Sequence, residues 1–159
     1  MLRLSEEVYL KPSVASLGIV AHEIGHAVQD TAGYAPVRIR AGLVPVANLG
    51  SNLAWVLFFV GFLLMALSHS FRDQGFAVAS VGVLLFVGVV LFYLVTLPVE
   101  LNASSRARTM LRNSGLVSGE EYEAASAVLS AAALTYVAAL LSALAQLLYF
   151  TLALFGMRR

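Results

Sequence analysis

Two long apolar segments dominate the hydrophobic pattern of this chain. They cover residues of about 53–71 and 76–97, and neither contains an Asp, Glu, Lys or Arg. As helices, both are long enough to cross roughly 30 Å of hydrocarbon. Only a short polar stretch around Arg72 and Asp73 separates them. The pattern therefore predicts a transmembrane hairpin.

A third apolar segment lies near the C-terminus. Residues 124–157 contain no charge, and at about 1.5 Å per residue such a helix is longer than a bilayer requires. We expect residues of about 134–156 to cross the membrane. Its many Ala and Ser residues suit close packing between membrane helices. The fold class expected is mostly α: an integral membrane helical protein with a hairpin and a third C-terminal span.

The polar residues fall into two blocks, 1–40 and 99–123. A hairpin returns the chain to its starting side, so both blocks should face one compartment. They hold most of the Lys and Arg residues, which places them in the cytoplasm by the positive-inside rule. We expect residues 1–159 to form a single domain.

Composition supports a membrane protein and excludes other classes. The chain is 60% hydrophobic and only 12% charged, with a mean hydropathy of +0.85, whereas soluble domains carry about 25% charged residues. The net charge of +1 gives no case for nucleic acid. There is no Cys, so a metal site must use His, Asp or Glu. Residues 1–11 lack the apolar core of a signal peptide.

The first polar block contains a predicted amphipathic helix. Ser13 is suited to cap its start, and the turn-forming residues 33–36 should follow its end. Before it, the alternation over residues 2–10 suggests a short strand. The expected buried stripe has spacings of three and four and comprises Val14, Leu17, Ala21, Ile24 and Val28.

An HExxH motif lies on this helix. His22 and His26 are four residues apart and therefore share a helix face, where both imidazoles can bind one Zn²⁺. Glu23 follows the first His, where a general base can reach water at the metal. Such short patterns also arise by chance. However, the chain has only three His, and a charge at Glu23 beside an apolar stripe needs a partner.

A catalytic zinc usually has three protein ligands, and Glu100 is the best candidate for the third. Among the nine acidic residues it alone follows the second span directly, and no other charge lies between Asp73 and Arg106. Pro98 would suit the first turn of a helix that carries it. The alternative is that Glu100 binds no metal and is a solvated carboxylate at the edge of the membrane. The metzincin extension fails because Gln29 and Ala32 occupy its Gly and His positions, and no span holds the Asp of site-2-type proteases.

Several segments resemble the YugP-like bacterial membrane zinc metallopeptidases. Residues 96–104, Thr-Leu-Pro-Val-Glu-Leu-Asn-Ala-Ser, are similar to that family's TLPVEFDAS segment, and residues 21–29, 33–36 and 43–48 also resemble it. The order of HExxH, two spans and a Glu is similar to that of HtpX-type membrane proteases. The resemblance implies one zinc ion bound by His22, His26 and Glu100, with Glu23 as the catalytic acid–base.

Two features depart from the family pattern. Asn102 stands where the family more often has Asp, which could orient a ligand His. The amide oxygen of Asn102 could accept the same hydrogen bond less strongly. The family also usually has a membrane helix before the region that matches residues 4–6, so we expect a short or shortened member.

The function expected is that of a zinc-dependent metalloendopeptidase in the bacterial cell membrane. Its partners would be the lipid bilayer and a protein or peptide substrate, with no nucleic acid. The alternative is a degenerate, metal-binding membrane scaffold that binds partners without cutting them. A transporter fits less well, because the spans lack the acidic residues of an ion path.

Overall fold

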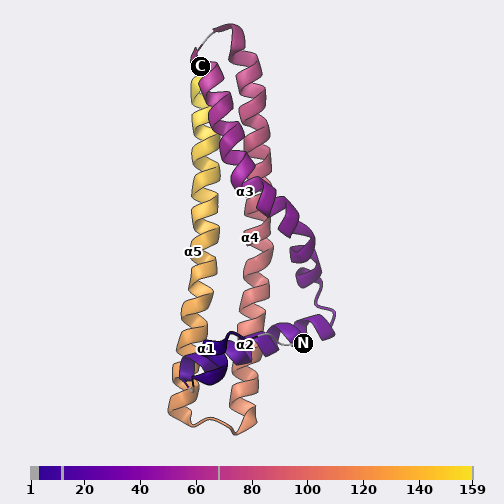
Figure 1. Ribbon diagram of the computed structural model, residues 1–159, viewed down its shortest axis with the longest axis vertical. Helices are drawn as coiled ribbons and strands as arrows, with labels where there is room; N and C mark the ends of the chain where they lie inside the picture. Colours follow the sequence, from indigo (N-terminus) through magenta and orange to yellow (C-terminus); the bar gives the residue numbers. More distant parts are fainter. Residues whose placement is uncertain (1–3, 12, 68, 159) are drawn as a thin grey trace. The chain divides into compact units, whose positions relative to one another are not determined.

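A computed structural model describes residues 4–11, 13–67 and 69–158 (Figure 1). This part of the chain is almost entirely helical and contains no strand, which confirms the mostly α fold class. In chain order the elements are α1 (Glu6–Leu10), α2 (Val14–Thr31), α3 (Ala35–Leu67), the short 3₁₀ helix η1 (His69–Phe71), α4 (Arg72–Ser114) and α5 (Gly119–Arg158).

Three helical segments of the described chain are long and apolar enough to cross a membrane. They are Ala35–Leu67, His69–Ser114 and Gly119–Gly156. The last two contain the predicted spans 76–97 and 134–156, whereas the first ends at Leu67, before the predicted end of the span 53–71. At most 28% of the most apolar part of each is buried within the protein, so most of that surface suits contact with lipid. The prediction of an integral membrane helical protein is confirmed at this level.

Two local predictions are wrong. The strand expected over residues 2–10 is the helix α1 from Glu6 onward, where the Ser5 hydroxyl accepts a hydrogen bond from the Val8 amide at 3.4 Å; Leu2 and Arg3 lie outside the described residues. Pro98 does not begin a helix but lies inside α4. A proline costs an interior helix one backbone hydrogen bond, and the apolar residues before it sustain α4 through that loss.

The chain divides into two compact units. One contains the residues up to Arg38 and Thr96–Ala138, and the other contains Ile39–Val95 and the residues from Ala139 onward. Helices α4 and α5 contribute to both units. The expectation of a single domain over residues 1–159 stays a prediction.

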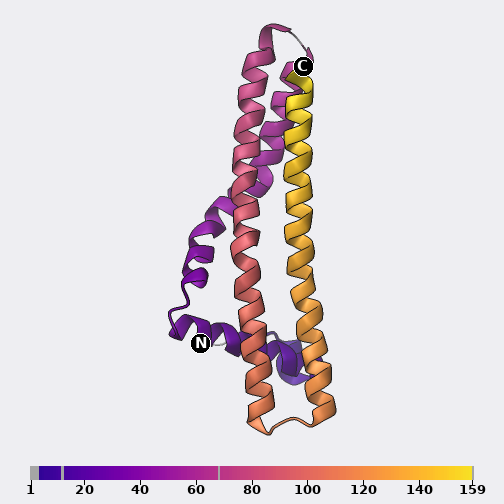
Figure 2. The ribbon, with the colours of Figure 1, turned by 180° about the vertical axis from the view of Figure 1, so that it is seen from behind.

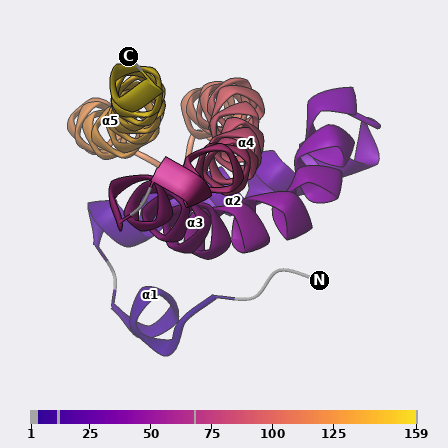
Figure 3. The ribbon, with the colours of Figure 1, turned by 90° about the horizontal axis from the view of Figure 1, so that it is seen from above.

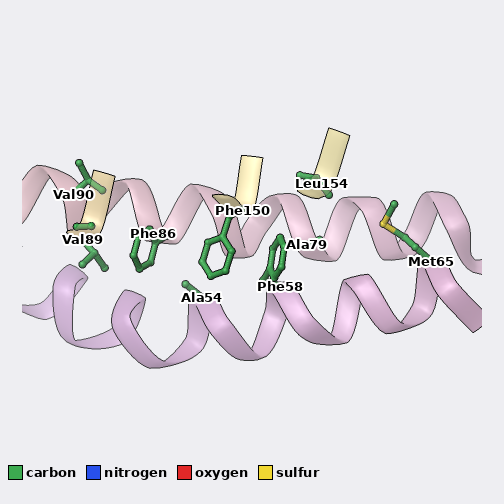
Figure 4. Packing of buried hydrophobic residues seen from close by; sticks show 10 residues of the cluster. Ala54, Phe58, Met65, Ala79, Phe86, Val89, Val90, Phe150 and Leu154 are labelled. Atoms are coloured by element: carbon green, nitrogen blue, oxygen red, sulfur yellow. The ribbon is translucent and has the colours of Figure 1, made fainter. Parts of the chain in front are cut away.

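Aromatic packing holds the unit formed by residues 39–95 and 139–159. Phe150 of α5 stacks on Phe58 of α3 with ring centroids 4.2 Å apart, and its edge contact with Phe86 of α4 spans 5.3 Å (Figure 4). All three helices therefore meet at Phe150, which is fully buried. Glycines bring α3 and α4 close together: a Cβ on Gly82 would lie 2.7 Å from the Ala54 carbonyl oxygen. Such small-residue contacts are typical of membrane helix pairs.

In the other unit, α2 packs across α4 and α5, which are joined by residues 115–118 (Figures 1 and 2). Its apolar core comprises Ala21, Ala107, Leu111, Ala125 and Leu129. Figure 3 shows α1 as a separate short helix, and it contacts α2. The predicted Ser13 cap is present, and α5 has a cap of its own. Ser13 accepts from the Ser16 amide at 3.0 Å, and α5 begins with reciprocal hydrogen bonds between Ser118 and Glu121.

The buried face of α2 differs from the predicted apolar stripe. It comprises Gly18, Ala21, Gly25 and Gln29, whereas Ile24 is exposed. Hydrophobicity alone therefore misplaced the face by part of a turn. The helix packs through its smallest residues because they allow its backbone to approach α4 and α5 closely.

Candidate metal centre

Three predicted ligands lie together within one unit. His22 and His26 are on α2, and Glu100 is on α4. The Glu100 Oε2 atom lies 3.1 Å from His22 Nε2 and 3.5 Å from His26 Nε2. Glu100 is 2% exposed, and the two imidazoles are half-buried. A single carboxylate oxygen therefore faces both Nε2 atoms.

This geometry fits a zinc ion. In a tetrahedral site with metal–ligand bonds of about 2.1 Å, ligand atoms lie roughly 3.4 Å apart. The observed separations of 3.1 and 3.5 Å bracket this value, and the ligand atoms of all three residues lie within 4.8 Å of one another. Two His and one Glu are also the donor set of a well-known class of catalytic zinc sites.

The other ring nitrogens are held by polar side chains that sequence reasoning missed. His22 Nδ1 lies 3.2 Å from the Ser104 hydroxyl, and His26 Nδ1 lies 2.9 Å from Gln29 Oε1. Gln29 and Ser104 are both buried. Helical spacing was an available signal, since Gln29 is three residues after His26 and Ser104 is four after Glu100.

Close backbone packing sets the distance between α2 and α4 at the site. A Cβ on Gly25 would lie 2.5 Å from the Ala103 carbonyl oxygen. Gly25 lies between the two imidazoles in sequence, and Ala103 lies between Glu100 and Ser104. The missing side chain of Gly25 thus lets the imidazoles reach Glu100.

Glu23 is half-buried beside the imidazoles. After Glu100 and Gln29, its charge is the smallest of the causes that raise the pKa of His26. No hydrogen bond or ion pair joins Glu23 to another residue of the described chain.

The role of Asn102 in orienting a ligand His stays a prediction, and no hydrogen bond joins it to either His in the described part of the chain. Its Oδ1 accepts hydrogen bonds from Gln29 Nε2 at 3.0 Å and from Arg106 Nε at 2.9 Å. Among the described residues, the cluster that could hold a metal includes none of the exposed acids Glu120, Glu121 and Glu123.

The electrostatics of the site favour a cation. The hydrogen bond with Glu100 is the main cause that raises the pKa of His26 above its usual value of 6.5, and Gln29 adds to this effect. The Glu100 carboxylate therefore favours positive charge at His26. A separate cavity of about 690 Å³ lies between α1, α2 and Glu121, and none of the three candidate ligands lines it.

The sequence comparisons identify the family of the chain. Residues 1–155 match the family described as "Putative neutral zinc metallopeptidase", and the chain belongs to that family. It is 41% identical over 152 residues to the "Putative membrane protease YugP" of Bacillus subtilis (strain 168). That alignment covers 96% of this chain and 64% of the relative. No solved structure matches the chain. The predicted resemblance is confirmed, and zinc is the metal that the family implies.

The contact at Gly25 yields a first prediction. Replacing Gly25 by Ala should lower the thermal stability and weaken zinc binding roughly tenfold, because overpacking against a backbone costs about 1–3 kcal/mol. Gly18→Ala is the matched control, since a Cβ there would lie at an ordinary 3.5 Å from the Ala125 carbonyl oxygen. Thermal unfolding and chelator competition in detergent measure both effects. Equal behaviour of the two variants would contradict the role of the Gly25 contact.

Proposed function

We propose that this chain is a membrane-embedded zinc metalloendopeptidase with one catalytic ion. The observation that carries the proposal is the convergence of His22, His26 and Glu100, with Glu23 next to His22 in sequence and without a hydrogen-bond or ion-pair partner in the described part of the chain. The chain spans 64% of the length of its Bacillus relative, so an activity of the whole relative enters here as part of the proposal. The substrate class is protein or peptide.

His22, His26 and Glu100 would hold the zinc ion. When bound, the ion would lower the pKa of a water molecule and polarise the scissile carbonyl group. The ligand residues would keep a fixed geometry, because each imidazole also has a hydrogen-bond partner for its Nδ1 atom. The fourth position would remain open for water and substrate.

Glu23 would move the proton during peptide hydrolysis. Its carboxylate would accept a proton from the attacking water and then donate it to the leaving amine. Three features of the site suit this role: its place next to His22, its partial burial and the absence of a competing partner among the described residues. We therefore assign it as general base and then general acid.

Zinc analysis tests the ligand set. The wild type should contain about one zinc per chain, and His22→Ala and Glu100→Ala should lose most of it, because a catalytic ion needs its third ligand. Glu120→Ala is the matched control for Glu100→Ala, as Glu120 is exposed and outside the cluster. Elemental analysis of the purified protein gives the answer. Full zinc in Glu100→Ala would refute this ligand set.

Glu23→Gln separates catalysis from metal binding. The amide has nearly the same shape but cannot accept the proton, so peptide hydrolysis should fall by about 10²–10⁴-fold while the zinc content stays at the wild-type level. Turnover of a casein-type substrate and the peptide profile of membrane extracts provide the measurements. Identical profiles for the two proteins would favour the alternative, a metal-binding scaffold without proteolytic activity.

We further propose a multi-pass protein of the bacterial cell membrane, with residues of about 53–71, 76–97 and 134–156 as its spans and the metal centre facing the cytoplasm. The basic residues of the polar blocks support this orientation. Because the chain has no Cys, single cysteines can be introduced for labelling. Cysteines at Asp30 and Ser105 should react from the cytoplasm, and one at Asp73 from the opposite side. Labelling of all three from one side would exclude the hairpin.

A further inference from the structure

A series of partly buried hydrogen bonds links Arg106 to His26. Arg106 Nε donates to Asn102 Oδ1, Gln29 Nε2 donates to the same oxygen, and Gln29 Oε1 faces His26 Nδ1 at 2.9 Å. Gln29 Nε2 also donates to the Val99 carbonyl oxygen at 2.8 Å. Gln29 is fully buried, so its amide can exchange no hydrogen bond with water.

The Arg106 guanidinium and the Val99 carbonyl group can each take only one role in these hydrogen bonds. A guanidinium only donates hydrogen bonds, and a backbone carbonyl only accepts them. Arg106 therefore turns the oxygen of Asn102 toward itself and toward Gln29. The oxygens of Val99 and Asn102 in turn require the NH₂ group of Gln29. The remaining atom of that amide, Oε1, must then face His26 and accept its proton.

We infer that Gln29, Asn102 and Arg106 are positioning residues that hold the proton of His26 on Nδ1 and so keep its Nε2 lone pair directed at the metal. The inference deepens the proposed zinc site and rests on it. The Nε2 atom lies 3.5 Å from Glu100 Oε2, so two acceptors face each other and a cation between them is favoured.

The position of the proton on His22 is not fixed in the same way. Its Nδ1 atom faces the Ser104 hydroxyl, which can donate or accept by rotating. Its Nε2 atom lies 3.1 Å from Glu100 Oε2, a normal hydrogen-bond distance. In the metal-free protein His22 therefore carries its proton on Nε2, donating to Glu100, and changes tautomer when metal binds. His26 is preset for the metal, whereas His22 adapts to it.

The tautomers can be read directly in the metal-free protein. Histidine ¹⁵N NMR of the detergent-solubilised full chain at about pH 9, where imidazoles are mostly neutral, should show the His26 proton on Nδ1 and the His22 proton on Nε2. In Gln29→Met, which removes the acceptor at similar volume, the His26 proton should move to Nε2 and bond to Glu100. His22 serves as the internal control and should not change. A His26 proton on Nε2 in the wild type, or one that stays on Nδ1 in Gln29→Met, would overturn the inference.

Zinc affinity provides a second measurement, by competition with a chelator. Gln29→Met should weaken zinc binding by about 10–100-fold, the usual effect of losing a group that orients a ligand. Gln146→Met in α5 is the matched control, since the Nε2 atom of Gln146 has no partner in the described chain. Unchanged affinity in Gln29→Met, with wild-type zinc content, would refute the positioning role of Gln29 and leave the proposed zinc site intact. A wild type that binds no zinc would refute the proposed function, while the tautomers could still be read.

Substitutions of Asn102 keep the test decisive if Gln29→Met does not fold. Asn102→Leu removes the oxygen that Gln29 and Arg106 share and should weaken zinc binding. Asn102→Asp retains an acceptor for both and should bind zinc like the wild type. Equal affinities in the Leu and Asp variants would overturn the inference.

Discussion

The contact between Gly25 and the Ala103 backbone is the constraint on which the metal centre depends. A helix normally keeps its neighbours 8–10 Å from its axis, and at the low end of this range small residues must lie at the crossing. Here the crossing lies between the two imidazoles on α2 and between Glu100 and Ser104 on α4. The donors therefore extend from both helices into the same space. Without that close approach, an HExxH helix would present two imidazoles and no carboxylate.

Burial makes the polar groups around this contact interdependent. Gln29, Glu100 and Ser104 are each at most 2% exposed, in a unit whose remaining core is mainly Ala and Leu. A buried polar atom without a partner destabilises a protein by about 1–3 kcal/mol, so each of these side chains has to be paired within the protein. The pairing orients both imidazoles, and the same requirement that stabilises the core therefore also shapes the donor set.

Asn102 illustrates how the tertiary structure changes the meaning of a substitution. At the level of sequence, an Asn in place of Asp weakens a presumed acceptor for a ligand His. In the structure the acceptor for His26 is Gln29 Oε1. Asn102 Oδ1 accepts hydrogen bonds from Gln29 Nε2 and from Arg106 Nε, and so fixes the orientation of the Gln29 amide. An amide oxygen is sufficient for that task, because both of its partners are strong donors. The departure from the family pattern thus leaves the hydrogen bonds of the site complete.

The sequence by itself determined the helical membrane class, the approximate spans, the metal helix with its Ser13 cap, and the candidate ligands, because hydropathy, helical spacing and ligand chemistry are local properties. It predicted a strand before α2, where the structure has a helix that begins after Ser5. It also predicted that a helix begins at Pro98, whereas α4 continues through this proline. Only the tertiary structure decided that Glu100 meets the imidazoles, that α2 packs through glycines and Ala21 rather than through Ile24, and that Gln29 and Ser104 orient the rings. Most of these features depend on contacts between residues far apart in the chain, such as His22 with Glu100 and Gln29 with Asn102, and no local pattern encodes which side chains such a crossing brings together.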